Sequence, residues 1–184
     1  MNNQLVTEHL LLRKATIDDL DFIWNRVWKE EELSRMMLWE PTYTFEEAKQ
    51  RLEKTIEYQK EHDAYFVCLK DTNEPIGFAG IRALPANEYE ESGICIAKDF
   101  QGRGYAKEVV GALKKLIFEQ LGGKRFYYGC FHENEKSRRV CLSQGFRYHH
   151  SQINVREWDH YEHQSDYYYF DRAMYEEEKQ SKEG

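Results

Sequence analysis

The sequence lacks the features that mark membrane-spanning and secreted proteins. No apolar run approaches the roughly 20 residues that a membrane span needs, and residues 1–4 carry neither the basic segment nor the apolar stretch of a signal peptide. We therefore expect a cytoplasmic protein that does not bind membranes. No Pro/Gly/Ser-rich linker divides the 184 residues, of which 41% are hydrophobic, so one sizeable core is expected. The sequence predicts a single domain over residues 1–175 and a flexible tail over residues 176–184.

Metal-ligand spacing and an excess of positive charge are missing as well. The seven histidines are not grouped with cysteines or carboxylates, and the cysteines lie singly within apolar segments, as buried free thiols do. These cysteines are Cys68, Cys95, Cys130 and Cys141. We therefore expect no metal site. The formal net charge of −7 argues against non-specific binding to nucleic acid and agrees better with a cationic amine as substrate.

The most informative stretch that is present is a glycine-rich turn at residues 99–106. Residues 92–97 before it have the short, β-branched, apolar character of a buried strand, and residues 104–121 after it repeat apolar side chains near the helical period. Such a turn offers an anion several backbone N–H groups and the positive end of a helix dipole. The stretch lacks the Gly-Lys-Ser/Thr of a P-loop and the third glycine of a dinucleotide fold. A tight turn without a ligand is the alternative.

The turn resembles the acyl-CoA loop of the GCN5-related N-acetyltransferase (GNAT) superfamily. That loop has the pattern Gln/Arg-x-x-Gly-x-Gly/Ala, and here it reads Gln101-x-x-Gly104-x-Ala106. Further segments resemble the ribosomal-protein-modifying, RimJ/RimL-type branch of the same superfamily. They are Asn134-x-x-Ser137 followed by Gly145-Phe146, the opening residues 7–13, and the connection at residues 39–48. Read alone, an N-cap asparagine and a glycine after a helix describe many helices.

The resemblance implies an α/β (α+β) fold with a mixed, mostly antiparallel central sheet, a splayed parallel strand pair and about four helices. The parallel pair is expected at residues 92–97 and 125–131, which flank the helix at 104–121 in a βαβ unit. Thr16 and Thr44, each followed three residues later by an acid, are expected to cap two earlier helices. The other expected strands are residues 5–14, 64–70, 75–82, 146–158 and 165–175.

The resemblance also implies acetyl-CoA as the co-substrate, held in the wedge between the splayed strands. Backbone groups of Ile94 and Ile96 would bind the pantetheine amides, and Asn134 would meet the pantetheine arm from the other side. The pyrophosphate would lie on the turn formed by Gln101, Gly102, Arg103, Gly104, Tyr105 and Ala106.

Acetyl transfer from a thioester to an amine needs a base for the amine, a polarised carbonyl and a proton for the leaving thiolate. Glu91 is the candidate base, because the related branch commonly has a glutamate before the glycine that is here Gly93. Glu88 and Glu90 lie close enough to take the same role, and a solvated acidic loop without a catalytic role is the alternative. Cys141 stands where many members carry a tyrosine that protonates the sulfur, and a buried cysteine is a poor acid. The ribosomal-protein-modifying branch likewise lacks that tyrosine and has a serine at this position, so the resemblance implies Ser137 as the candidate donor to the sulfur or to a relay water. A plain helix-capping or solvated serine explains Ser137 equally well.

The acceptor is expected to lie near residues that the motifs do not constrain. Candidate acceptor-binding side chains are Trp39, Tyr43, Trp158 and Tyr161. We expect an N-acetyltransferase that transfers the acetyl group directly, in a ternary complex, to a protein N-terminus, a polyamine or a small metabolite. A catalytically silent acyl-CoA-binding module is the alternative. The aromatic run at 167–170 fits a core or an intersubunit face, which leaves a homodimer open.

Overall fold

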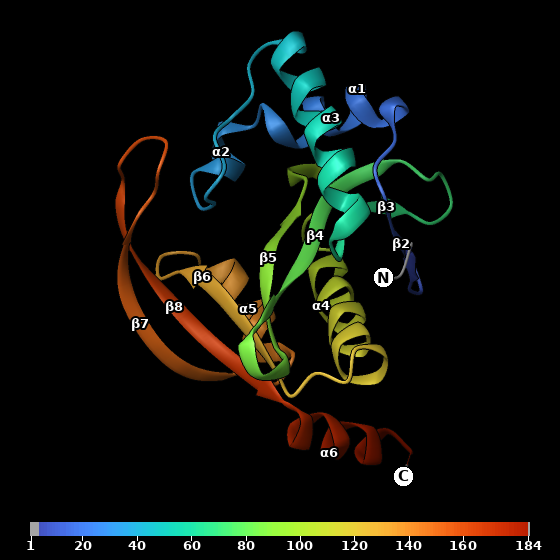
Figure 1. Cartoon of the computed structure of the whole chain (residues 1–184), viewed down its shortest axis with the longest axis vertical. Helices are drawn as coiled ribbons and strands as arrows, with labels where there is room; N and C mark the ends of the chain where they lie inside the picture. The colour runs from blue at the N-terminus through green and yellow to red at the C-terminus, as the bar shows by residue number, and fades with distance from the viewer. Residues whose placement is uncertain (1–3, 184) are drawn as a thin grey trace.

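The computed structural model describes residues 4–183, which form one eight-stranded sheet covered by helices on both faces (Figure 1). The order of the strands is β1-β2-β3-β4-β5-β6-β8-β7. The strands are β1 (Gln4–Val6), β2 (Leu10–Arg13), β3 (Ala64–Leu69), β4 (Pro75–Leu84), β5 (Glu88–Ile96), β6 (Arg125–Phe131), β7 (Arg147–Val155) and β8 (Glu162–Asp171). The predicted mixed, mostly antiparallel sheet is confirmed.

The helices number slightly more than the sequence predicts. They are α1 (Leu20–Ile23), α2 (Glu31–Ser34), α3 (Phe45–Glu61), α4 (Tyr105–Lys115), α5 (Glu135–Ser143) and α6 (Arg172–Glu183). Short 3₁₀ or π turns add η1 (Ile17–Asp19), η2 (Trp24–Trp28), η3 (Pro85–Asn87), η4 (Lys98–Phe100) and η5 (Leu116–Gln120). Within residues 4–183, every helix is too short or too polar to cross a membrane.

The first strand expected from the sequence, residues 5–14, is in fact a hairpin of β1 and β2. The chain turns between them, with the Thr7 N–H donating to the Leu10 carbonyl at 2.9 Å. Glu108 of α4 holds this turn, because its carboxylate accepts from the Thr7 hydroxyl and from the His9 N–H. The turn therefore depends on a residue about 100 positions away, which the local pattern does not reveal.

Side chains alternate between two cores along β3, as expected for a strand covered on both faces. Tyr65 and Val67 join the cluster that packs against α4, whereas Phe66 and Cys68 join the cluster formed with the α1–α3 region. At the start of α3, Thr44 forms the expected capping box with Glu47, since its hydroxyl accepts from the Glu47 N–H at 3.3 Å.

The parallel strands β5 and β6 pair only at one end. Residues 88–90 of β5 lie opposite residues 125–127 of β6, after which β5 stays with β4 and leaves β6 (Figure 1). A register shift between Ala79 and Ile81 of β4 marks a bulge at this point of β5, where Gly93 has φ +120°. The predicted splayed pair is confirmed, and β5 begins four residues before the expected start at 92 because its polar residues 88–91 still pair.

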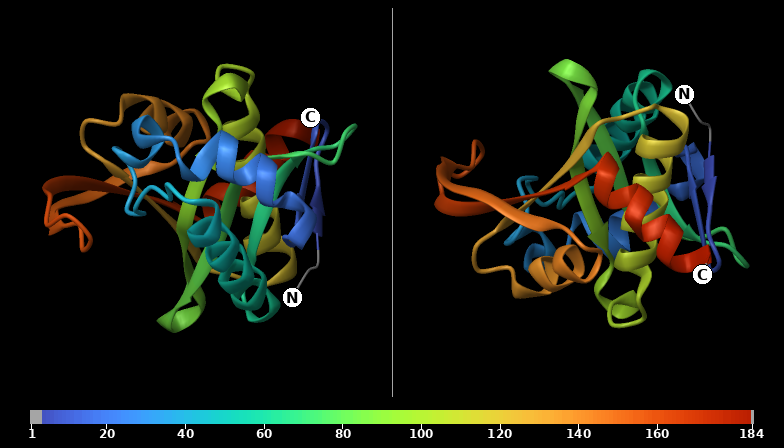
Figure 2. Two further views of the ribbon diagram at one scale, coloured as in Figure 1. Left: turned by 90° about the horizontal axis from the view of Figure 1, so that it is seen from above. Right: turned by 90° about the horizontal axis from the view of Figure 1, so that it is seen from below.

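The C-terminal residues are ordered into α6 instead of forming the expected flexible tail over 176–184, of which residues 176–183 lie within the described part. Tyr175 stacks on Phe118 with ring centroids 4.9 Å apart, and Glu178 pairs with Lys114 of α4. Figure 2 shows α6 lying beside α4 when the protein is viewed from below. These contacts between distant parts of the chain stabilise a segment whose local sequence is polar.

Candidate active site

A groove of about 1910 Å³ lies where β5 and β6 separate. The glycine-rich turn lines one part of it, and the bulge of β5, the adjoining part of β6 and the start of α5 line the rest. Eleven of the residues singled out from the sequence line this groove: Trp39, Glu91, Ile94, Ile96, Gln101, Gly102, Gly104, Tyr105, Ala106, Asn134 and Ser137. The other four of the fifteen candidate site residues do not line it: Arg103, Tyr43, Trp158 and Tyr161.

The glycine-rich turn is shaped to receive an anion. Gly102 and Gly104 have φ of +78° and +82°, and a Cβ added at either position would meet nothing within 4 Å. Helix α4 begins directly after Gly104. Within the described chain, the backbone N–H groups of residues 102–107 have no protein acceptor. Free N–H groups at a helix start together with the helix dipole are the usual protein site for a phosphate.

The side chains of Gln101 and Arg103 hydrogen-bond to backbone carbonyl groups of the protein. Gln101 donates through Nε2 to the Ile96 carbonyl at 2.9 Å and therefore ties the turn to the end of β5. Arg103 donates to the Asp99 carbonyl at 3.1 Å and is exposed outside the groove, so only its backbone belongs to the turn. Arg103 can therefore contribute to the expected pyrophosphate site only through its backbone.

Beyond residue 90, the edge of β5 that faces the wedge has no partner strand, although the Ile96 carbonyl accepts from the Gln101 side chain. The Ala97 N–H donates to the Ile76 carbonyl of β4 at 2.7 Å. Because backbone groups point alternately to either side along an antiparallel strand, those of Ile94 and Ile96 point away from β4 and toward the wedge. On the opposite wall, Asn134 caps α5 by accepting from the Ser137 N–H at 3.1 Å, which leaves its amide nitrogen facing no protein acceptor in the described chain.

Glu91 lies at the bulge of β5 and is largely withdrawn from water. Burial raises the pKa of Glu91 to about 7, although the Gly93 N–H opposes this by donating to its Oε2 at 2.7 Å. Gly129 of β6 leaves room beside the carboxylate, since a Cβ there would lie 3.7 Å from Oε1. A carboxylate with a pKa near neutrality can accept a proton from an amine and return it to water.

Ser137 does more than occupy the first turn of α5. Its hydroxyl lies 2.8 Å from the hydroxyl of Tyr128, which reaches it from β6. Burial raises the pKa of Tyr128 and the pKa of Cys141, so both groups stay protonated. The sequence analysis missed Tyr128. The only signal was its alternation with Phe126 and Cys130, whose side chains share one face of β6.

The aromatic residues expected at the acceptor site are only partly brought together. Trp39 lines the groove, whereas Tyr43 is exposed and donates to Glu31 at 2.8 Å. Trp158 and Tyr161 pack on Arg156, with the guanidinium 4.6 and 5.2 Å from their ring centroids. Tyr43, Trp158 and Tyr161 therefore do not line the groove. Tyr43 precedes α3, whereas Trp158 and Tyr161 belong to the connection between β7 and β8 and support it.

Arg156 attaches the β7–β8 connection to the segment after α2. The guanidinium is buried and donates to the carbonyl groups of Ser34, Arg35 and Met37 at 3.0 to 3.2 Å. It also pairs with Asp159. These two segments meet at one edge of the groove, since Arg35, Met37 and Arg156 all line it.

Among residues 4–183, no group of three or more side chains is arranged to hold a metal ion.

Comparisons with known proteins agree with this architecture. The chain is 28% identical over 146 residues to a Bacillus subtilis protein described as an uncharacterized N-acetyltransferase, YoaA. The aligned residues cover 78% of this chain and 82% of that protein. A GNAT-family acetyltransferase from Bacillus anthracis superposes with a TM-score of 0.78 at 20% identity, covering 91% of this chain and 98% of the other. RimL, an α-N-protein acetyltransferase of a ribosomal protein, solved in complex with coenzyme A, gives a TM-score of 0.78 at 20% identity, covering 93% and 99%. Residues 9–147 match the family model of the acetyltransferase (GNAT) domain, and the chain therefore belongs to the GNAT acetyltransferase family.

Proposed function

We propose that this protein transfers the acetyl group of acetyl-CoA to a primary amine by direct attack in a ternary complex. The observation that carries the proposal is the groove itself. It joins an open turn, whose backbone N–H groups have no acceptor in the described chain, to a carboxylate whose pKa is about 7. Family membership supports acetyl transfer, and the arrangement of residues supports an amine acceptor.

The residues present fit acetyl-CoA. Its pyrophosphate would be held by the backbone N–H groups of residues 102–107, where the two glycines leave room for a close approach. Its pantetheine arm would extend the open edge of β5 by hydrogen bonding to Ile94 and Ile96, with the amide of Asn134 on the other side. The reactive thioester would then lie near Glu91 and Ser137.

Glu91 would act on the acceptor. An alkyl ammonium has a pKa well above neutrality, so it must lose a proton before its nitrogen can attack. The Glu91 carboxylate would accept that proton, directly or through a water molecule, because its pKa of about 7 lets it release the proton again. The amine nitrogen then bonds to the carbonyl carbon, and the bond from that carbon to sulfur breaks.

Ser137 would serve the leaving group. Its hydroxyl donates a hydrogen bond or a proton to the departing sulfur, and the Tyr128 hydroxyl, 2.8 Å away, orients it and can replace the proton. Since burial keeps Tyr128 protonated, this pair remains a hydrogen-bond donor across the working pH range. Cys141 takes no part, because burial keeps its thiol protonated and unreactive.

Titration of the purified chain with acetyl-CoA, followed by analysis of acetylated products from a panel of amines, tests the proposal. We expect saturable binding and an acetylated amine in an amount equal to the CoA released. Tight binding with no product from any amine would favour the alternative, a silent acyl-CoA-binding module. Intact-protein mass spectrometry after incubation with acetyl-CoA alone should show no acetyl adduct, whereas an adduct that disappears on adding amine would contradict direct transfer.

A further inference from the structure

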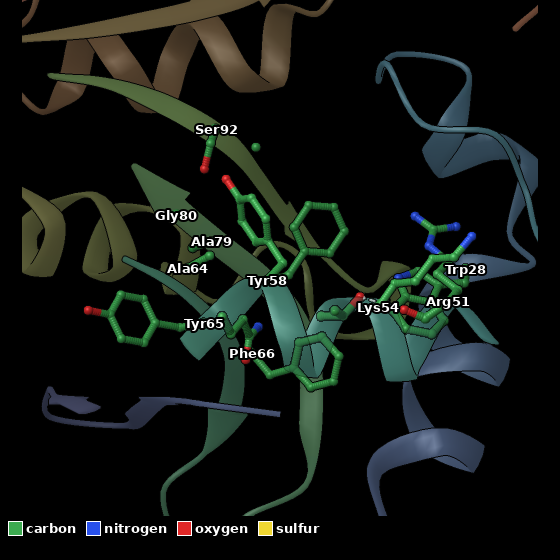
Figure 3. Close-up of a pocket in the computed structure, with 14 residues that line it drawn as sticks. Trp28, Arg51, Lys54, Tyr58, Ala64, Tyr65, Phe66, Ala79, Gly80 and Ser92 are labelled. Atoms are coloured by element: carbon green, nitrogen blue, oxygen red, sulfur yellow. Dashed lines mark hydrogen bonds between the residues drawn. The ribbon is translucent and has the colours of Figure 1, made fainter. Parts of the chain in front are cut away.

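A second pocket, of about 390 Å³, lies between α3 and the strands β3, β4 and β5 (Figure 3). It is continuous with the groove, because the same five residues line both: Arg51, Tyr58, Phe78, Ser92 and Gly93. Ser92 and Gly93 directly follow Glu91 in the bulge of β5, so one end of this pocket adjoins the proposed base. Its volume is that of a small-molecule site.

The charges in this pocket are all of one sign. Two cations, Arg51 and Lys54, line it, and no carboxylate of the described chain does. Figure 3 shows both cations beside Trp28 at one end, and Tyr58 with its hydroxyl pointing toward Ser92 at the other. Arg51 and Tyr58 are two turns apart on α3, which corresponds to about 10 Å along the helix axis. The pocket therefore has a cationic end and an end next to the Glu91 carboxylate.

Only part of the Arg51 guanidinium hydrogen-bonds to the described chain. It lies over the rings of Trp28 and Trp39, 4.6 and 5.1 Å from their centroids, and donates through Nη1 to the Glu40 carbonyl and the Thr42 hydroxyl. Its Nε and Nη2 have no protein acceptor in the described chain. The Glu40 carboxylate acts on it only from beyond ion-pair distance, and burial lowers the pKa of Arg51 to about 10, which still leaves it charged.

This environment differs from that of other withdrawn arginines of the protein. Arg13 pairs with Asp19 at 2.8 Å, and Arg156 pairs with Asp159. Arg51 has aromatic rings and neutral acceptors where those two have a carboxylate. A half-buried guanidinium that is held in place but has no carboxylate partner in the protein can bind a carboxylate of a ligand. Its planar donor groups match the two oxygens of a carboxylate.

We propose that the acceptor is a small amine that also carries a carboxylate, which Arg51 binds with help from Lys54 while the amine lies at Glu91. The inference rests on the proposed acetyl transfer and selects among its acceptor classes. The second ammonium of a polyamine would face two cations here, which is unfavourable. The backbone of a protein N-terminus brings no carboxylate of its own to Arg51.

A matched panel of acceptors tests this inference. It contains ω-amino carboxylates with two to six carbons, the carboxamide of each, and a phosphorylated amine, and kcat/KM is measured with the full chain and acetyl-CoA. For at least one length we expect the carboxylate to exceed its carboxamide by tenfold or more. Arg51→Met should remove that preference by raising KM for the carboxylate, with the carboxamide nearly unchanged, and Arg51→Lys should restore part of it.

Lys60→Met is the matched control, since Lys60 is an exposed cation of the same helix that pairs with Glu57 and does not line the pocket. It should leave the preference intact. Equal kcat/KM for carboxylates and carboxamides, an equal loss of both in Arg51→Met, or a phosphorylated amine that surpasses every carboxylate would each overturn the inference. These outcomes still include acetylated amines, so they are distinct from failure of the proposed function, in which no amine is acetylated.

Discussion

Replacing Glu91 with glutamine should make the protein less active and, at alkaline pH, more stable. Both effects come from the same withdrawal of the carboxylate from water, which raises the pKa of Glu91 to about 7 from an ordinary 4.5. A carboxyl group with a raised pKa favours folding while it is protonated. That contribution is present below about pH 4.5 and is lost as the pH rises through 7.

The size of the stability effect follows from the two pKa values. Their difference corresponds to about 3 kcal/mol when Glu91 is fully ionised in the folded protein. The groove admits some water, so we expect Glu91→Gln to gain about 1 to 2 kcal/mol at pH 8. For a chain of this length that is a rise of about 4 °C in the unfolding midpoint, and the gain should shrink toward zero at pH 5.

The effect on catalysis has the opposite sign. Loss of a general base lowers kcat by about 10² to 10⁴ fold. In the unmodified protein, kcat/KM should rise about tenfold from pH 6 to pH 8 and level off, because only the ionised carboxylate accepts a proton. That inflection should be absent in the glutamine variant and should keep its position with acceptors of different pKa.

Thermal unfolding at pH 5 and pH 8, together with pH profiles of kcat/KM, measures both effects in one set of proteins. Glu90→Gln is the control, since Glu90 is the next residue on the strand but pairs with Arg82. It should not gain the stability that Glu91→Gln gains, and it should keep an inflection slightly below that of the parent, because the Glu90 charge helps to raise the pKa of Glu91. A Glu91→Gln protein that is active, or that is less stable than the parent at pH 8, would refute the reasoning.

Three further predictions concern the other walls of the groove. Ser137→Ala should lower kcat by about tenfold or more with little change in CoA affinity, and Tyr128→Phe should lower it less, because Tyr128 acts only through the serine; steady-state kinetics with a CoA titration checks both. Gly104→Ala should weaken CoA binding by at least tenfold in calorimetry. Gly122→Ala is the control, because it places alanine at a similar φ of +65° in open space away from the groove. The control should bind CoA normally and should lose a similar amount of stability. Arg156→Met should lower the free energy of unfolding by about 2 to 3 kcal/mol in urea titrations, because it leaves buried carbonyl groups without a donor; an unchanged midpoint would contradict this.

The sequence predicts those features that depend on neighbours in the chain. The capping box of Thr44 and the turn before α4 are both formed by residues within a few positions of each other. The helix period and the glycines therefore identify them without knowledge of the fold. The family resemblance added the splayed strand pair, which no local pattern reveals.

Features that depend on contacts between distant segments escaped the sequence analysis. Tyr128 meets Ser137 only because β6 and α5 pack in one particular register. The sequence has three consecutive aromatic residues at 126–128, and no local signal shows which of them contacts Ser137. Helix α6 is anchored through Lys114 and Glu178, 64 positions apart. The places of Trp158 and Tyr161 outside the groove have the same origin, because an aromatic side chain can equally line a pocket or pack against an arginine.

Release of the CoA thiol by the purified chain, followed at pH 8 with a thiol reagent in the presence and absence of amines, tests the central claim most directly. The account predicts release that depends on the amine, equals the acetylated product in amount and is lost in Glu91→Gln. Release without an amine, or none with any amine although acetyl-CoA binds, would contradict it.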